Sequence, residues 1–241
     1  MTTAHPRPAA TLILARPGSP EPEVLLLRRS AAAKFMPNAF VFAGGAVDQQ
    51  DETPDIRSWC SPPDDAEASV VMGLPSGGQG YFIAAVREAF EECGLLLAYD
   101  SAGELADLSR WDPEALRKLR EDLSSGAETL SAICAAHRWR LALDRLAYFA
   151  HWVTPATMAR RFDTRFFLAL APPLQTASLA AQEMSDLCWR TPAQALKDAA
   201  DGKILLFRAT KTILEEVSQF QTLAALLAYA QGPRTIHSVM P

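Results

Sequence analysis

The stretch that decides the fold runs from residue 87 to residue 94 and reads Arg87-Glu88-Ala89-Phe90-Glu91-Glu92-Cys93-Gly94. On a helix, Glu88 lies i to i+3 from Glu91 and i to i+4 from Glu92, so all three carboxylates can approach one point on one face. Like charges at this spacing destabilise a helix by about 0.2–0.5 kcal/mol per pair. We therefore expect a compensating cation, and a hard divalent ion bound by oxygens is the natural candidate.

The residues around these carboxylates favour a short, well-anchored helix. Apolar side chains recur at three- or four-residue intervals from Phe82 to Cys93, which gives the helix one face for a core. Gly94 follows the last apolar position, where a residue that accepts positive φ can end a helix. A pair of glutamates alone is more often a solvated helix face than a site. The upstream sequence is therefore needed to distinguish a solvated helix face from a metal site.

A double glycine lies upstream, at the end of an apolar run that reads Phe40-Val41-Phe42-Ala43-Gly44-Gly45. Glycine lets the backbone approach a ligand or a metal closely. Together the two stretches resemble the Nudix box, G-x5-E-x7-R-E-x-hydrophobic-E-E-x-G-hydrophobic. Gly45 matches the leading glycine, and the segment from Arg87 to Leu95 matches the second half without a gap. The resemblance implies an α/β fold, the Nudix α/β/α sandwich with a mixed β-sheet.

The box departs from the family pattern at two places. Its first glutamate is replaced by Asp51, whose carboxylate is expected to pair with Arg87 as the family's glutamate does. Residues 52–86 then separate Asp51 from Arg87, where the pattern has only seven residues. The segment 52–80 is rich in proline and glycine, so we expect it to be a surface loop inserted into the box. A box split in this way is similar to that of the Nudix subgroup of acyl-CoA diphosphatases.

The resemblance implies a metal site at the box. The carboxylates of Glu88, Glu91 and Glu92, together with the carbonyl of Gly45, would bind Mg²⁺ or Mn²⁺. Such an ion neutralises charge on the phosphate oxygens and lowers the pKa of an attacking water. Mg²⁺ in particular prefers a few carboxylates completed by substrate phosphates and waters.

The resemblance also implies catalytic roles. Arg87 would orient the box through its carboxylate partner, and Glu88 and Glu92 would act as catalytic carboxylates. The general base stays open between Glu88 and a carboxylate from a later loop, for which Glu183 is the candidate. For Glu183 an exposed loop acid is an equally good interpretation.

Basic residues near the double glycine are candidates for binding an anionic substrate. An Arg-Ser-Ala segment at 29–31, followed by a second basic residue, is similar to the segment that precedes the double glycine in CoA-cleaving Nudix enzymes, although the spacing is one residue short. Guanidinium groups match phosphate geometry well, although each of these side chains can also be a solvated surface charge. The positions assigned to substrate binding are Arg28, Arg29, Lys34, Arg165 and Gly44.

Composition sets the class of protein. The chain has 241 residues and is 49% hydrophobic, which suits a single elaborated domain over residues 1–241. A net charge of −5 and a pI near 5.4 argue against nucleic acid and anionic membranes as partners. No apolar run approaches the roughly 20 residues that span a bilayer, so cytoplasmic residence is expected. The substrate is expected to be a small molecule, and a homodimer is possible.

The remaining pattern alternates strands and helices. A helical insertion is expected at about residues 103–146, with a helix from Pro113, a second over 129–136 and a third over 138–143. Strands are expected at 11–16, 24–29, 39–42, 148–153, 165–171 and 184–189. Further helices are expected at 192–200 and at 210–230.

The favoured function is hydrolysis of a diphosphate linkage in a nucleoside diphosphate derivative with Mg²⁺, and the favoured substrate is CoA or acyl-CoA. One alternative is a hydrolase of other nucleotide-linked diphosphates, such as sugar nucleotides or dinucleotides. Another is a non-catalytic Nudix domain that senses a nucleotide. All three box glutamates are present, which favours an enzyme.

Overall fold

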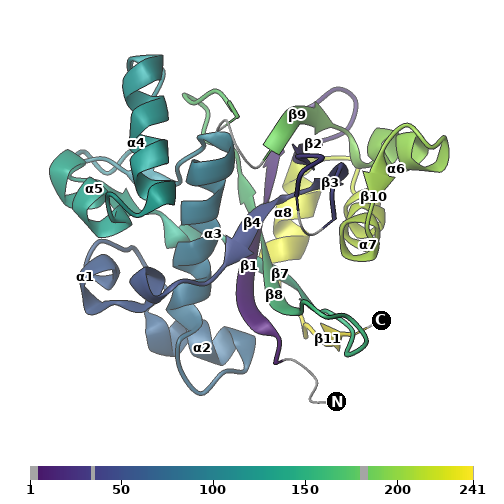
Figure 1. The fold of residues 1–241 in the computed structure, drawn as a ribbon, viewed down its shortest axis with the longest axis horizontal. Helices are drawn as coiled ribbons and strands as arrows, with labels where there is room; N and C mark the ends of the chain where they lie inside the picture. Colours follow the sequence, from purple (N-terminus) through teal and green to yellow (C-terminus); the bar gives the residue numbers. More distant parts are fainter. Residues whose placement is uncertain (1–4, 34–35, 180–183, 241) are drawn as a thin grey trace.

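The structure, a computed structural model, describes residues 5–33, 36–179 and 184–240 (Figure 1). A mixed sheet lies at its centre, in the order β10-β3-β2-β1-β8-β7-β11, with β4 paired to β1 and β9 paired to β2. The strands are β1 (Arg7–Arg16), β2 (Glu23–Arg29), β3 (Ala39–Val41), β4 (Ala43–Ala46), β7 (Ala147–Val153), β8 (Phe162–Leu170), β9 (Met184–Arg190), β10 (Leu205–Leu206) and β11 (Ser238–Val239). The helices are α1 (Pro54–Arg57), α2 (Asp65–Met72), α3 (Gly78–Cys93), α4 (Pro113–Ser125), α5 (Leu130–His137), α6 (Pro192–Ala200), α7 (Arg208–Val217) and α8 (Leu223–Gln231).

Strand β1 organises the two faces of the sheet. It pairs in parallel with β8 and antiparallel with β2 and β4. Its side chains alternate between two cores: Leu12 and Leu14 pack with α3, while Ile13 and Ala15 pack with α7 and α8. Because both faces are covered, the strand is apolar almost throughout. The expected sandwich with a mixed sheet is confirmed.

The six strands expected above are present, with boundaries that differ by a few residues, whereas Leu95–Leu97, whose apolar run also predicts the start of a strand, precede the short β5 (Ala98–Tyr99) without belonging to it. Gly44 and Gly45 lie in β4, where they pair with Thr11 and Ala10 of β1. Helix α3 carries the acidic stretch and ends at Gly94, which adopts φ 72° and donates its N–H to the carbonyl of Phe90. The expected glycine cap is confirmed.

The insertion at 52–80 is not the loop that its composition predicts. It contains α1, α2 and the first turn of α3. The prolines and glycines punctuate these helices rather than prevent them: Pro54 follows the N-cap Thr53, and Gly73 ends α2 with φ 65°. Asp64 caps α2 by accepting a hydrogen bond from the amide of Glu67. Local capping chemistry therefore outweighs overall composition here.

The second insertion is helical at α4 and α5, as expected, but residues 138–143 are not. Arg138 adopts φ 55° and ends α5, after which β6 (Arg140–Leu141) pairs with β5 (Ala98–Tyr99). Leu141 is fully buried there.

The long helix expected at 210–230 is two helices, α7 and α8. Thr222 accepts a hydrogen bond from the amide of Ala225 and begins α8, so the apolar stripe continues across a break in the backbone. Among the helices of the described residues, none is both long and apolar enough to cross a membrane.

Candidate active site

The guanidinium of Arg87 is the centre of the site. The side chain is 2% exposed, and its Nε and Nη2 donate to the two carboxylate oxygens of Asp51 at 2.9 and 3.0 Å. Nη2 also donates to the carbonyl of Ala46 at 2.9 Å. Such a planar, bidentate contact is what arginine provides and lysine does not. The pairing expected between Asp51 and Arg87 is therefore present, although the insertion lies between them.

Glu88 and Glu91 share the remaining side of the same guanidinium. Nη1 of Arg87 donates to Oε1 of Glu88 at 2.9 Å and to both carboxylate oxygens of Glu91 at 3.2 Å. The Glu88 carboxylate also lies directly against Gly45, where a Cβ atom would overlap it. A side chain at position 45 would therefore have to displace the Glu88 carboxylate.

Glu92 points to a different group. Its Oε2 accepts a hydrogen bond from the amide of Gly44 at 2.9 Å, which joins the last turn of α3 to β4. Arg87 thus holds Glu88 and Glu91, and Gly44 holds Glu92, so the approach of all three carboxylates to one cation stays a prediction. In the part of the chain that the structure describes, no three His, Cys, Asp or Glu side chains form a ready-made metal cluster.

The site holds more negative charge than its own cation offsets. Besides its closer partners, Arg87 has the carboxylate of Asp48 at 3.7 Å. Burial raises the pKa of Glu88 to about 7, and burial also raises the pKa values of Glu91 and Asp51, despite the neighbouring guanidinium. Burial alone would lower the pKa of Arg87, but the surrounding carboxylates outweigh it and raise that pKa. Crowded, half-compensated carboxylates are a donor set that fits a hard divalent cation.

The basic residues assigned to substrate binding are placed in different ways. Arg28 is exposed near the end of β2 and donates to the side chain of Asn38 at 3.3 Å. Arg29 ends β2 opposite Met184 of β9. Lys34 and the candidate base Glu183 both lie outside the described residues.

Arg165 is buried rather than presented at the surface. It forms an ion pair with Asp163, and its guanidinium lies 5.1 Å from the ring centroid of Tyr81. Asp163 in turn contacts Nε2 of His151 at 2.5 Å. The alternation along β8 contained the signal for this, because Arg165 shares its side of the strand with the buried Phe167. This packing favours a structural role for Arg165 over contact with a substrate.

Sequence reasoning missed two groups at the site. The carbonyl of Ala46 is a backbone acceptor, for which no side-chain signal exists. Asp48 lies between the double glycine and Asp51 but matches no letter of the box pattern.

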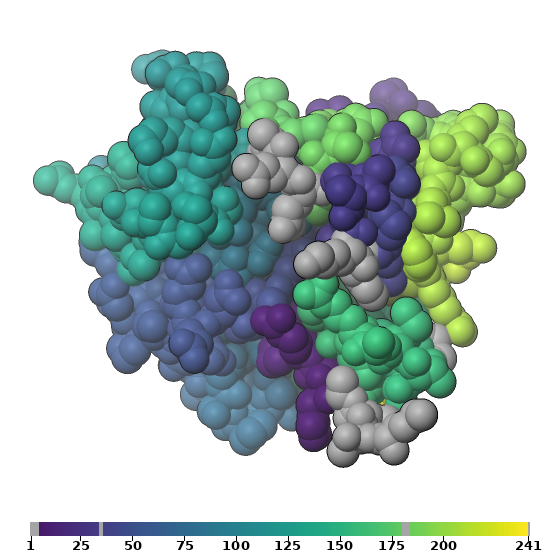
Figure 2. Space-filling model, in the orientation of Figure 1, coloured from purple at the N-terminus to yellow at the C-terminus, as the bar shows by residue number. Residues whose placement is uncertain are grey.

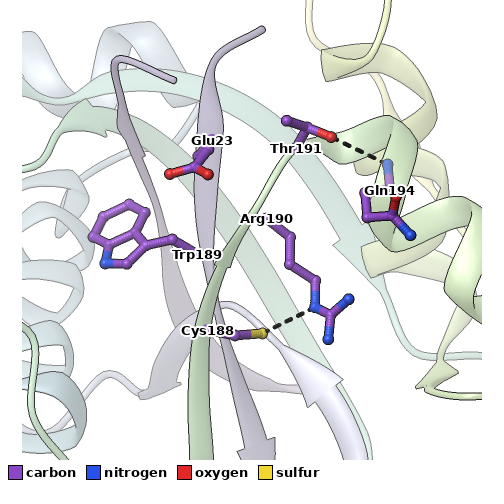
Figure 3. A pocket seen from close by; sticks show the side chains of 6 residues that line it. All are labelled: Glu23, Cys188, Trp189, Arg190, Thr191 and Gln194. Atoms are coloured by element: carbon purple, nitrogen blue, oxygen red, sulfur yellow. Dashed lines mark hydrogen bonds between the residues drawn. The ribbon is translucent and has the colours of Figure 1, made fainter. Parts of the chain in front are cut away.

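The surface around the site is shaped by the insertions. Figure 2 shows α4 and α5 as a projecting lobe at one end of the molecule. A separate surface pocket of about 370 Å³ lies at the end of β9, where Arg190 points to Cys188 and Thr191 begins α6 (Figure 3). That pocket contains none of the box residues.

Comparison with known proteins decides the family. Residues 65–210 match the NUDT19 Nudix domain, and this range contains the whole second half of the box. The chain belongs to the Nudix family. Nudix hydrolases use divalent metals, which agrees with the charge balance around Arg87. The half of the box at Gly44 and Gly45 lies outside the matched range, but the contacts with Glu92 and Glu88 bring it to the same site.

Individual relatives of this chain support the same family. It is 31% identical over 212 residues to the acyl-coenzyme A diphosphatase NUDT19 of Xenopus laevis, a match that covers 76% of this chain and 56% of the relative. It is 27% identical over 273 residues to the human protein of that name, with 94% and 72% covered. The chain thus spans little more than half the length of the Xenopus relative. A crystal structure of a Nudix hydrolase from Alicyclobacillus acidocaldarius has a TM-score of 0.78 at 28% identity, covering 96% of this chain and all of that one.

Proposed function

We propose that this Nudix chain hydrolyses the diphosphate linkage of CoA or acyl-CoA. The observation that carries the proposal is the assembly of one box from two distant segments, with Gly44 and Gly45 against Glu92 and Glu88. The substrate class rests on the split box and on the relatives described as acyl-CoA diphosphatases. In the reaction a water oxygen bonds to one phosphorus, the bridging P–O bond breaks, and two phosphate-ended products leave.

The box carboxylates would hold the metal. Glu88, Glu91 and Glu92, with the carbonyl of Gly45, are the proposed ligands, and Mg²⁺ or Mn²⁺ the proposed ion. When bound, the ion supplies charge neutralisation at the phosphate oxygens and a more acidic water. Arg87 holds Glu88 and Glu91 in place; it contacts both oxygens of Glu91 but only Oε1 of Glu88, which leaves Oε2 of Glu88 for other partners.

A general base has to accept the proton of the attacking water. Glu88 is the described candidate, because it lies between Arg87 and Gly45 at the centre of the box. Glu183 remains the second candidate. Replacing each by glutamine separates them, since the true base also sets the pH at which turnover rises.

On the substrate side, Arg28, Arg29 and Lys34 are proposed to contact phosphate groups of CoA. Gly44 is proposed only as a point of close backbone approach, since its amide is already bonded to Glu92. Cytoplasmic residence, a small-molecule substrate and a homodimer are parts of the same proposal. A sedimentation measurement on the purified chain tests the homodimer.

A substrate panel tests the activity. CoA, an acyl-CoA, a sugar nucleotide and a dinucleotide are each incubated with the protein and Mg²⁺, and products are separated by chromatography. We expect release of 3′,5′-ADP from CoA and from acyl-CoA. Robust cleavage of the sugar nucleotide without 3′,5′-ADP would instead establish the alternative specificity, and binding without any turnover would establish the nucleotide-sensing alternative.

The variant Glu92→Gln tests the box itself. It keeps the shape of the side chain and its contact with Gly44 but removes the charge, so we expect turnover to fall at least about 100-fold. Glu114→Gln, at an exposed position on α4, is the control. Unchanged turnover in Glu92→Gln on every cleaved substrate would contradict the proposed metal site.

A further inference from the structure

Both insertions contact an end of α3, the helix that carries the box glutamates. At the N-terminal end, the carboxylate of Asp65 accepts hydrogen bonds from the amides of Gly77 and Gln79 at 3.0 and 3.1 Å. The hydroxyl of Ser69 accepts a third from the amide of Gly78 at 3.0 Å. Helix α2 of the first insertion thus satisfies the free amides at the start of α3.

At the C-terminal end the contact comes from Arg120 of α4, in the second insertion. Its Nη2 donates to the carbonyls of Glu91 and Ser178 at 3.0 and 2.9 Å, and its Nη1 donates to Oγ of Ser178 at 3.0 Å. The amide of Ser178 donates to the carbonyl of Cys93 at 2.9 Å. The last turn of α3 is therefore joined to α4 and to the segment around Ser178 through one guanidinium and one serine.

The burial of Arg120 is unusual for this helix. Arg120 is 2% exposed, whereas α4 presents most of its other residues to solvent. Within the described residues no carboxylate lies within 4.0 Å of it, its Nε has no partner, and burial lowers its pKa. A buried cation with only neutral acceptors is costly, and an apolar residue would continue the leucine stripe of α4 more cheaply. The negative end of the α3 dipole offsets only part of that cost.

Gly94 makes room for this arrangement. Its φ of 72° suits glycine, and a Cβ atom there would also lie 3.0 Å from Nη1 of Arg120. The glycine that closes the box sequence is thus favoured by its backbone conformation, and a side chain there would also crowd the guanidinium beside it.

We propose that Arg120 is a positioning residue for the Nudix reaction, acting through α3. Arg120 holds the carbonyl of Glu91 and so fixes the position of the last turn of α3 relative to β4. That position determines where Glu92 contacts Gly44. The second insertion would then tune the metal site without touching the substrate. This inference rests on the proposed function.

The test compares three α4 variants: Arg120→Met, Leu123→Ala and Arg117→Met. Leu123 is the other buried residue of α4, and its variant lowers stability without removing a hydrogen bond to α3, while Arg117 is exposed. We expect Arg120→Met to weaken Mn²⁺ binding, measured by electron paramagnetic resonance, and to lower kcat by about 10- to 100-fold, with KM nearly unchanged. The two controls should stay within about twofold of the unaltered protein. An Arg120→Met protein that matches Leu123→Ala in Mn²⁺ binding and kcat would overturn the proposal.

A milder variant covers the case in which Arg120→Met does not fold. Ser178→Ala removes one hydrogen-bond acceptor of Arg120 and keeps the guanidinium. We expect it to weaken Mn²⁺ binding and to lower kcat, each by about threefold. Unchanged Mn²⁺ binding and kcat in Ser178→Ala would count against the proposal. Failure of the proposed function is distinguishable, because the unaltered protein would then cleave no substrate while the Mn²⁺ titrations still rank the variants.

Discussion

Gly45 shows how a single residue joins the two halves of the box. The carboxylate of Glu88 occupies the space that any side chain at position 45 would need. The same carboxylate accepts from Arg87, which is itself locked to Asp51, so Glu88 has little freedom to move away. A methyl group at this point therefore has to displace a side chain of the proposed metal site.

We accordingly expect Gly45→Ala to lower turnover at least about tenfold and to weaken metal binding, because Glu88 is moved. The fold should survive, since position 45 is an ordinary residue of β4 apart from this contact. Turnover on CoA and far-UV circular dichroism measure the two effects. Gly232→Ala is the control, because a Cβ there meets only two backbone oxygens, at 3.1 and 3.5 Å, far from the site. Full activity in Gly45→Ala would mean that Glu88 does not sit where the site requires it.

At the scale of helices and strands, the first insertion packs against the start of α3 and stabilises it. Helix α2 supplies the caps at the start of α3, and the two helices pack closely at Gly78, where a Cβ atom would overlap the backbone of Ser69. Gly80, one position beyond Gln79, faces a different neighbour. A Cβ there lies 3.1 Å from Cγ of the exposed Glu52, which can move aside.

The two glycines of the first turn should therefore respond in opposite ways to alanine. Gly80→Ala should raise the free energy of unfolding by about 0.5 kcal/mol, because alanine loses less backbone entropy in a helix. Gly78→Ala should lower it by more than about 1 kcal/mol, because α2 has to shift. Urea unfolding followed by circular dichroism checks both. Equal effects of the two changes would show that the insertion does not pack against α3.

For the whole molecule, stability against acid depends on buried ion pairs within the sheet. Burial alone would raise the pKa of Asp163, but the hydrogen bond with His151 and the charge of Arg165 hold that pKa below its ordinary value. A carboxylate whose folded pKa is depressed stabilises the protein above its unfolded pKa, and that stabilisation is lost as pH falls through the folded pKa. Strands β7 and β8, which carry these residues, also contribute to both cores.

We expect Asp163→Asn to lower the free energy of unfolding at pH 7 by about 2–4 kcal/mol, because Arg165 is left buried without its counter-charge. The difference from the unaltered protein should shrink as pH falls below about 4, where the carboxylate becomes protonated in the unaltered protein too. Urea titrations at a series of pH values measure it. Asp201→Asn, at an exposed ion pair with Lys203, should show almost no difference at any pH. A difference for Asp163→Asn that does not change with pH would contradict the assigned cause.

The amino-acid sequence by itself determined the chemistry and the main elements. The spacing of Arg87, Glu88, Glu91 and Glu92 follows from helix periodicity, and Gly94 from the backbone conformation that ends a helix. Both are local properties of the chain, so a short stretch of sequence is enough to predict them. The strands were predictable for the same reason, because alternation and apolar runs are set by the burial of each strand's own side chains.

Only the tertiary structure decided which distant groups share the site. The insertion 52–80 folds into helices that bring Asp51 back to Arg87, whereas its composition predicted a loop. The contact of Glu92 with Gly44, the contact of Arg165 with the Tyr81 ring and the hydrogen bond of Arg120 to the carbonyl of Glu91 each join residues far apart in the sequence. Such contacts depend on how elements pack, and packing is not encoded in the pattern of any one element.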